Sequence, residues 1–322
     1  MATPPPSRHP EEVARAVEAG AAAHSPVVAS WTRSSKLHSL SPERDVSPER
    51  VADTSLARER EALGRLLEAA QPSLDQVFEL VGNAGCSVVM ASSTGVVIDR
   101  RGKVADDDTF KSWGLWTGAV WTERSQGTNA IGTSLVEQRP VMIHRDEHFL
   151  NRNTILSCMT APVHGELGGL AAVIDVSSAR SDLTEDFAKM IFTIACDAAR
   201  RIETQNFNMA FAGARMVMLG DQARVGPALL AIDKHDIVIG ATHAARRSLG
   251  LALGGQIEGI PAPELLGRQA QDVDSLGSAE HGVLLRAMQR YHHNMTKTAK
   301  ALGLSRATLY RKLHQHGIVI EK

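Results

Sequence analysis

Residues 294–313 restrict the fold more than any other stretch of this chain, because they predict two short helices separated by a tight turn. Leu309 and Leu313 lie four residues apart, so they share one face of the second helix. Gly303 falls where the chain must leave the first helix, and glycine adopts a positive φ there without steric cost. Ser305 follows at an N-cap position, where its hydroxyl can accept from the amides of the next turn.

The second helix leaves a polar face that is rich in hydrogen-bond donors. Long basic side chains, hydroxyls and an aromatic ring at a helix start are typical of a helix that enters the major groove of DNA. Eight Lys or Arg residues against two acids give residues 279–322 a net charge of +6, whereas the whole chain has a formal net charge of −1. A basic face that is merely solvated is the alternative. The residues expected to contact DNA are Thr296, Ser305, Arg306, Thr308, Tyr310, Arg311 and Lys312.

Different roles are expected within this set. Arg306 would contact a guanine edge, because a guanidinium can donate two parallel hydrogen bonds to that base. The other donors would position the helix through phosphates or neighbouring bases, and Tyr310 could do either.

This region resembles a known family. The runs Thr298-Ala299, Leu302-Gly303-Leu304-Ser305-Arg306 and Thr308-Leu309-Tyr310-Arg311-Lys312-Leu313 are similar to the C-terminal helix-turn-helix of the Fis family, found also at the ends of bacterial enhancer-binding regulators. The resemblance covers residues 279–318 and implies binding to double-stranded DNA as a homodimer on an inverted repeat. A predicted helix over residues 279–291 supports pairing, since it offers more apolar side chains than one short hairpin can cover: Val283, Leu284, Ala287, Met288 and Tyr291.

The length and composition of the chain limit its number of domains and its class. With 322 residues, of which 43% are hydrophobic, the chain is long enough for two or three domains with cores of their own. Its three cysteines form no CxxC pair, which argues against a zinc ribbon and fits a reducing compartment. We find neither a run of ~20 apolar residues nor the apolar core of a signal peptide. The expected location is the cytoplasm, on the nucleoid.

The body of the chain alternates between helical and extended patterns. Apolar residues at helical spacing run from 56 to 80, interrupted at Pro72, and again from 183 to 207. Between these segments we expect a hairpin over 86–99, a helix after 127, a strand at 140–144 and a second hairpin over 154–176. Two helical segments around antiparallel strands predict an α+β sensory module.

This stretch resembles the GAF domain of the regulators of acetoin and glycerol catabolism, over nearly all of residues 11–206. Four segments carry the resemblance: Ser30-Trp31-Thr32-Arg33-Ser34, Thr122-Glu123-Arg124-Ser125-Gln126-Gly127-Thr128-Asn129-Ala130-Ile131-Gly132-Thr133, Glu147-His148-Phe149 and Ala172-Val173-Ile174-Asp175-Val176-Ser177. A smaller strand–turn–strand–helix pattern over 226–253 looks like a reduced PAS-type module, as some of those regulators carry. The expected organisation is a helical, partly disordered region over 1–55, a GAF sensor over 56–206, a PAS-like module over 207–253, a linker over 254–278 and an all-α Fis-type domain over 279–322.

The sequence departs from those regulators in one respect. They carry an ATPase between the sensor and the helix-turn-helix, with a phosphate loop of the form GxxxxGK[ST]. Here Gly102-Lys103 is followed by Val104, and Val97 occupies the position of the first glycine. Residues 207–278 are also too few for such a domain, so we expect no ATP hydrolysis.

A small-molecule site in the sensor is one interpretation of its tryptophans. Three of them cluster in a chain with only 4% aromatic residues, and could form the apolar wall of a pocket with a few polar groups. Ordinary packing is the alternative; Asn129 could equally cap the next helix and Glu123 could pair with an arginine. The candidate effector pocket is Trp113, Trp116, Trp121, Glu123, Thr128 and Asn129.

Other candidate sites are weak. His144 and His148 are four residues apart, but the segment leaves a strand, where that spacing does not converge on a metal. Cys158 and Cys196 lie in apolar runs and are expected to be buried and inert. We expect no enzyme, no metal and no cofactor.

The sequence therefore predicts a DNA-binding transcriptional regulator of a metabolic operon, controlled through a GAF sensor and acting without ATP. Further partners could be an effector, RNA polymerase or a related regulator, with no membrane. An architectural DNA-bending protein, and an accessory subunit of an ATPase-containing regulator, remain alternatives.

Overall fold

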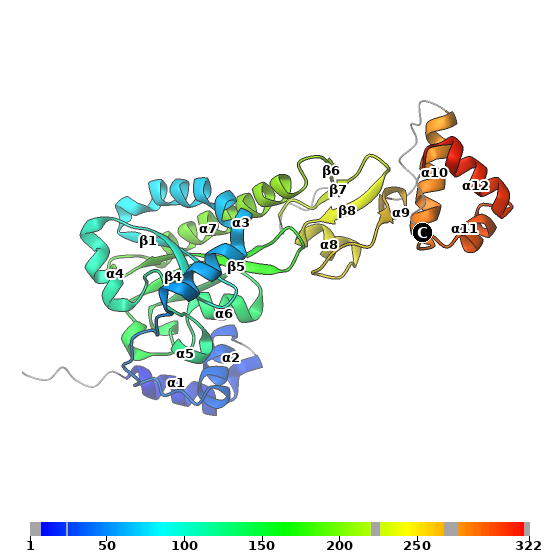
Figure 1. Cartoon of the computed structure of the whole chain (residues 1–322). Helices are drawn as coiled ribbons and strands as arrows, with labels where there is room; N and C mark the ends of the chain where they lie inside the picture. The colour runs from blue at the N-terminus through cyan, green and yellow to red at the C-terminus, as the bar shows by residue number, and fades with distance from the viewer. Residues whose placement is uncertain (1–7, 24, 220–225, 267–275, 319–322) are drawn as a thin grey trace, which may run out of the picture. The chain divides into compact units, whose positions relative to one another are not determined.

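The computed structural model describes residues 8–23, 25–219, 226–266 and 276–318. The chain forms two compact units, of which the first is Met1–Gly165 with Leu170–Met209 and the second is Glu166–Gly169 with Ala210–Lys322 (Figure 1). Of the region over 1–55 that is expected to be partly disordered, residues 1–7 and 24 lie outside the described residues.

A five-stranded antiparallel sheet forms the centre of the first unit. The strand order is β2-β1-β5-β4-β3, so both expected hairpins are confirmed. Every residue of β1 and β4 is buried, because helices cover both faces of the sheet; this is why these strands have long apolar runs rather than strict alternation. The strands are β1 (Cys86–Ser92), β2 (Val97–Arg101), β3 (Val141–His144), β4 (Ser157–His164) and β5 (Leu170–Ser178).

Two long helices, α3 (Asp53–Val81) and α7 (Glu185–Ala210), pack on one face of this sheet (Figure 1). The expected interruption at Pro72 is wrong. The helix continues through Pro72 and is kinked instead at Gly64, where φ is 40° and ψ is −111°. Leu74 and Val77, beyond the proline, are buried against the sheet, so tertiary packing outweighs the hydrogen bond that Pro72 cannot donate.

Shorter helices cover the opposite face, where they enclose a second core with the buried Trp121 and Phe110. Helix α6 packs across β3, β4 and β5, and begins where the sequence predicts a change from turn to helix. The helices are α4 (Asp107–Trp113), α5 (Glu123–Gln126) and α6 (Ala130–Glu137).

The N-terminal helices belong to the first unit as well. Val13 and Val17 of α1 are buried in a cluster with Phe149 and Leu150, so one face of this helix in the region expected to be helical packs against the sensor. The segment contains α1 (His9–Glu18), α2 (Pro26–Thr32) and a π-helical turn, η2 (Arg33–Leu37). Short 3-10 turns complete the unit: η1 (Ala21–Ala23), η3 (Gly82–Ala84), η4 (Val104–Asp106), η5 (Arg145–Glu147) and η6 (Asn151–Asn153).

A four-stranded antiparallel sheet in the order β6-β7-β8-β9 begins the second unit. Arg246 is only 2% exposed, and its guanidinium donates to three carbonyl oxygens, those of Ala241, Ala252 and Gly255. Strand β9 and helix α9 lie inside the segment expected to be a linker. The elements are β6 (Arg215–Met218), β7 (Leu229–Ile232), β8 (Ile237–Ala241), α8 (His243–Leu249), β9 (Ile260–Pro261) and α9 (Ala262–Leu266).

Three helices complete the described part of the chain: α10 (Leu276–Arg290), α11 (Met295–Ala301) and α12 (Arg306–Gln315). Leu309 and Leu313 are fully buried together with Leu284, Met288 and Ala299. The apolar spacing in the sequence thus predicted both the helices and their shared core.

Candidate functional site

Local hydrogen bonds fix both ends of the turn between α11 and α12. Asn294 caps α11 by accepting from the amide of Lys297 at 3.0 Å, and Ser305 caps α12 by accepting from the amide of Thr308 at 3.1 Å. Gly303 has a φ of 66°, as the sequence predicts, and the amide of Leu304 then returns to the carbonyl of Ala299. The turn is therefore set by residues adjacent in sequence.

The buried leucines of α12 determine which side chains face solvent. Arg306, Tyr310 and Arg311 are exposed, the tyrosine at 44%. Their helical positions are also shared by Ala307 and His314, which the sequence prediction omitted. Spacing of three and four residues from Tyr310 and Arg311 could have identified both. We call Arg306, Ala307, Tyr310, Arg311 and His314 the reading face.

The remaining expected contacts are placed differently. Thr296 is exposed on α11, and Thr308 is half-buried with its hydroxyl 2.8 Å from that of Ser305. Lys312 is half-buried and forms an ion pair with Glu280 of α10. This ion pair could not be predicted from the sequence, because no spacing rule relates residues on different helices.

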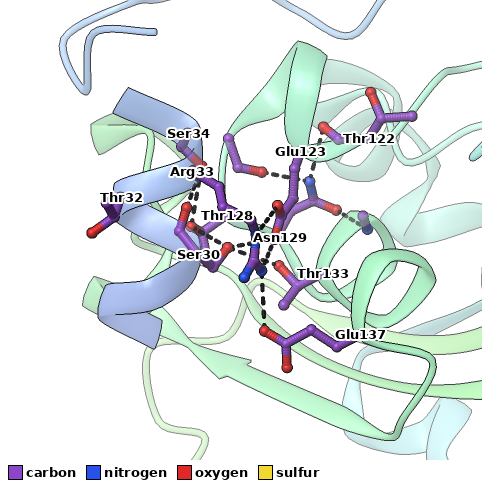
Figure 2. Close-up of polar contacts among 12 residues, drawn as sticks. Ser30, Thr32, Arg33, Ser34, Thr122, Glu123, Thr128, Asn129, Thr133 and Glu137 are labelled. Atoms are coloured by element: carbon purple, nitrogen blue, oxygen red, sulfur yellow. Dashed lines mark hydrogen bonds and ion pairs between the residues drawn. The ribbon is translucent and has the colours of Figure 1, made fainter. Parts of the chain in front are cut away.

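A buried polar network joins the N-terminal helices to α5 in the sensor (Figure 2). Glu123, 2% exposed, accepts from the Ser30 hydroxyl at 2.5 Å and from two nitrogens of the Arg33 guanidinium at 2.8 and 2.7 Å. Thr128 lies 2.7 Å from the Ser30 oxygen. Arg33 also reaches Glu137 on α6 at 3.0 Å. One arginine thus bridges two carboxylates on adjacent helices.

Hydrogen bonds and charge pairing together shift the pKa of the Glu123 carboxyl group more than burial does. Burial alone would raise the pKa of Glu123, but hydrogen bonds from Arg33 and Ser30, with the attraction of the guanidinium, lower it below its ordinary value. The Arg33 pKa is raised by the hydrogen bond to Glu123. The predicted pairing of Glu123 with an arginine is confirmed, although the sequence alone does not identify a partner 90 residues away.

The other candidates for an effector pocket have partners of their own. Asn129 accepts from the amide of Gly132 at 2.8 Å, which confirms the predicted cap of α6. Trp121 is buried and donates to the carbonyl of Gly114 at 2.8 Å.

The two remaining tryptophans contact cations. The Trp116 ring centroid lies 4.2 Å from the Arg100 guanidinium and 4.5 Å from the Lys111 ammonium. The Trp113 centroid lies 5.6 Å from the Arg152 guanidinium.

A second buried acid lies on β5. Asp175 is fully buried and accepts from the hydroxyls of Thr160 and Ser177, both at 2.5 Å. Burial raises the pKa of its carboxyl to about 6, against the opposing effect of these two hydrogen bonds. The pKa of Asp175 therefore lies closer to neutrality than the ordinary value of an aspartate.

Burial also determines the protonation of the other candidate groups. His148 is fully buried and donates from Nδ1 to the carbonyl of Arg145, and burial lowers its pKa to about 4. Burial raises the thiol pKa of Cys158 well above its ordinary value and that of Cys196 to about 11, so both are protonated at neutral pH. Among the described residues, no group of three or more His, Cys, Asp or Glu side chains could hold a metal ion. No described helix is long and apolar enough to cross a membrane.

A capped helix-turn-helix with a basic exposed face, and an α+β domain that precedes it, define the class of DNA-binding regulators with a sensor-like domain. The family models agree. Residues 10–204 match the model for the MimR N-terminal domain, and residues 275–316 match that for bacterial regulatory proteins of the Fis family. The chain belongs to the MimR N-terminal domain family.

The chain is similar to several transcriptional regulators. The chain is 27% identical to the acetoin catabolism regulatory protein of Cupriavidus necator over 90% of its own length and 44% of that protein. It is 29% identical to the acetoin dehydrogenase operon transcriptional activator AcoR of Bacillus subtilis, over 56% of this chain and 30% of the relative. It is 31% identical to the propane 2-monooxygenase operon transcriptional activator MimR of Mycolicibacterium smegmatis, over 56% of this chain and 29% of the relative. The chain spans less than half the length of each.

A solved structure supports the fold. A chain in the crystal structure of the E. coli DhaR(N)–DhaL complex superposes with a TM-score of 0.50 at 17% identity, covering 71% of this chain and 77% of that one. This likeness shows the fold alone, and it agrees with the predicted α+β class.

Proposed function

We propose that this chain regulates transcription of a catabolic operon by binding a specific DNA sequence through α12. The observation that carries the proposal is the reading face of α12, held on a buried Leu309–Leu313 core in the region that matches the Fis family. An arginine at the first turn of such a helix can donate to a guanine edge. The named relatives are regulators of catabolic operons, which suggests the kind of target.

Within this proposal, Arg306 reads a base, while Arg311 and the hydroxyls of Thr296, Thr308 and Ser305 position the helix on phosphates. Tyr310 contacts either a base or the backbone. The exposure of Arg306, Arg311 and Thr296 supports these roles.

The sensor controls this binding without nucleotide hydrolysis. No GxxxxGK[ST] motif occurs in the chain, and residues 207–278 hold a small sheet where the related regulators are expected to carry an ATPase. The domain limits proposed are those of the sequence analysis: sensor over 56–206, PAS-like module over 207–253 and DNA-binding domain over 279–322. A small-molecule effector would bind the sensor, near the tryptophans and the Glu123 network. The protein would act on the nucleoid, with RNA polymerase or a related regulator as a further partner.

Pairing of two chains on an inverted repeat completes the proposal. Of the five side chains expected to pair, Leu284, Ala287 and Met288 are already buried within the chain, whereas Val283, 43% exposed, and Tyr291, half-buried just after α10, are accessible to a partner. Three of the five apolar side chains on which the expectation of pairing rested are therefore covered within the chain itself.

The test is selection of bound duplexes from a randomised pool by the full-length chain, followed by chromatin immunoprecipitation with and without candidate carbon sources. A shared inverted-repeat motif at a few genomic sites, with occupancy that responds to a carbon source, is expected. Broad binding without a motif would instead favour an architectural protein. Occupancy that requires a co-purifying ATPase regulator would favour an accessory subunit.

A further inference from the structure

One carboxylate connects the first and last helices of the DNA-binding domain. Glu280 on α10 accepts from the Lys312 ammonium of α12 and lies 3.1 Å from Nε2 of His316, the residue that directly follows this helix. Lys312 and His316 are four residues apart, so the last turn of α12 and its C-cap present both side chains to the same acid. The hydrogen bond from Lys312, and then that from His316, lower the pKa of the Glu280 carboxyl below its ordinary value. Glu280 is therefore charged at neutral pH.

Helical geometry separates Lys312 from its neighbour Arg311. An α-helix turns by about 100° per residue, so Lys312 projects about 60° from the buried Leu309, whereas Arg311 projects about 160° from it. Burial agrees with this geometry, because Arg311 is exposed and Lys312 is half-buried. Arg311 thus faces the reading side of α12, and the adjacent Lys312 faces its packing side.

We propose that Glu280 is a positioning residue of the DNA interface, which holds Lys312 on the packing side of α12 and out of contact with phosphate. The inference rests on the proposed DNA-binding function and differs from the sequence-based expectation for Lys312. A pair this exposed adds little stability by itself. The pair instead determines where the Lys312 ammonium lies when the reading face binds DNA.

The salt dependence of binding distinguishes the two cations. Each phosphate that a protein cation neutralises adds about 0.9 to the slope of log K against log salt, because counterions are released. A lysine that is already neutralised by Glu280 adds almost nothing to this slope. Releasing Lys312 from Glu280 would let it approach phosphate and steepen the slope.

The experiment measures fluorescence anisotropy of the full-length chain on a duplex that it selects from a randomised pool, across about 50–200 mM salt. Lys312→Met keeps the aliphatic stem, and Arg311→Met is its matched control. We expect Arg311→Met to flatten the slope by about 1 and Lys312→Met to leave it unchanged. We expect Glu280→Gln to steepen it by up to about 1, and Glu280→Gln with Lys312→Met to match Lys312→Met alone.

The inference is overturned if Lys312→Met flattens the slope as much as Arg311→Met does. It is also overturned if Glu280→Gln weakens binding at an unchanged slope, because that result indicates a merely structural acid. If the Glu280→Gln variant loses its helical circular dichroism signal, it has not folded. The comparison of the salt slopes of Lys312→Met and Arg311→Met then tests the inference. Failure of the wild-type chain to select any duplex would contradict the proposed function itself.

Discussion

Arg306 occupies the first turn of α12, directly after the Ser305 cap, with its side chain exposed. Replacement by alanine should cost about 1–3 kcal/mol of binding free energy on the selected sequence and relax the preference at one base pair. Arg311→Ala should instead weaken all sequences alike. Anisotropy titrations on the selected duplex and on single-base variants measure both effects. Equal losses on every duplex for Arg306→Ala would show that it contacts phosphate and not a base.

Asp175 and His148 influence stability in opposite directions over the same pH range. Burial raises the Asp175 pKa from 3.8 to about 6, so the folded state loses stability as pH rises from about 4 to 6. Burial lowers the His148 pKa from 6.5 to about 4, so the folded state loses stability as pH falls through that window. The two effects partly cancel.

Asp175→Asn removes one of these opposing contributions. The variant lacks the ionisation that destabilises the wild type as pH rises, so its stability relative to wild type should be greater at pH 7.5 than at pH 4.5, by about 2 kcal/mol. Its stability should also increase more steeply from pH 4 to 6.5 than that of wild type. All four tryptophans lie in the first unit, so urea unfolding followed by tryptophan fluorescence reports on that unit alone. Parallel pH profiles for the two proteins would contradict the assignment.

At the scale of elements, Arg33 attaches the N-terminal helices to α5 and α6. Arg33→Met leaves the Glu123 carboxylate buried with only hydroxyl donors, which should cost about 3 kcal/mol and release residues 9–40 from the sensor. Arg139→Met is the matched control, because Arg139 also pairs with Glu137 but is 47% exposed and does not contact Glu123. Hydrogen exchange in α1 and α2 measures the release. Comparable protection in both variants would show that the apolar contacts of Val13 and Val17 suffice without the ion pair.

Other elements show where local patterns are decisive. The caps at Asn294 and Ser305, and the positive φ at Gly303, follow from residues within a few positions of each turn. The kink of α3 does not, because the long apolar face beyond Pro72 compensates for the missing hydrogen bond and the chain bends at Gly64. Rules based on neighbouring residues predicted the caps and the turn correctly, whereas packing against a distant surface overrode such a rule at Pro72.

At the scale of the whole molecule, the proposed dimer makes a geometric prediction. Two copies of α12 should occupy half-sites about 34 Å apart, one turn of DNA. Insertion of about five base pairs between the half-sites rotates one to the opposite face of the duplex, so affinity should fall to that of a single half-site. Sedimentation of the chain with each duplex counts the chains bound. Unchanged affinity after the insertion would indicate a monomer that binds one half-site.

The sequence by itself determined the helix-turn-helix, the antiparallel hairpins and the absence of a phosphate loop, because each depends on residue types at short, fixed spacings. Only the tertiary structure decided which charges are paired. Arg33 meets Glu123 across 90 positions, and Lys312 meets Glu280 across 32, through contacts that exist once helices pack. Periodicity predicts which side of a helix is buried, but an ion pair between two elements depends on how the folded chain brings them together.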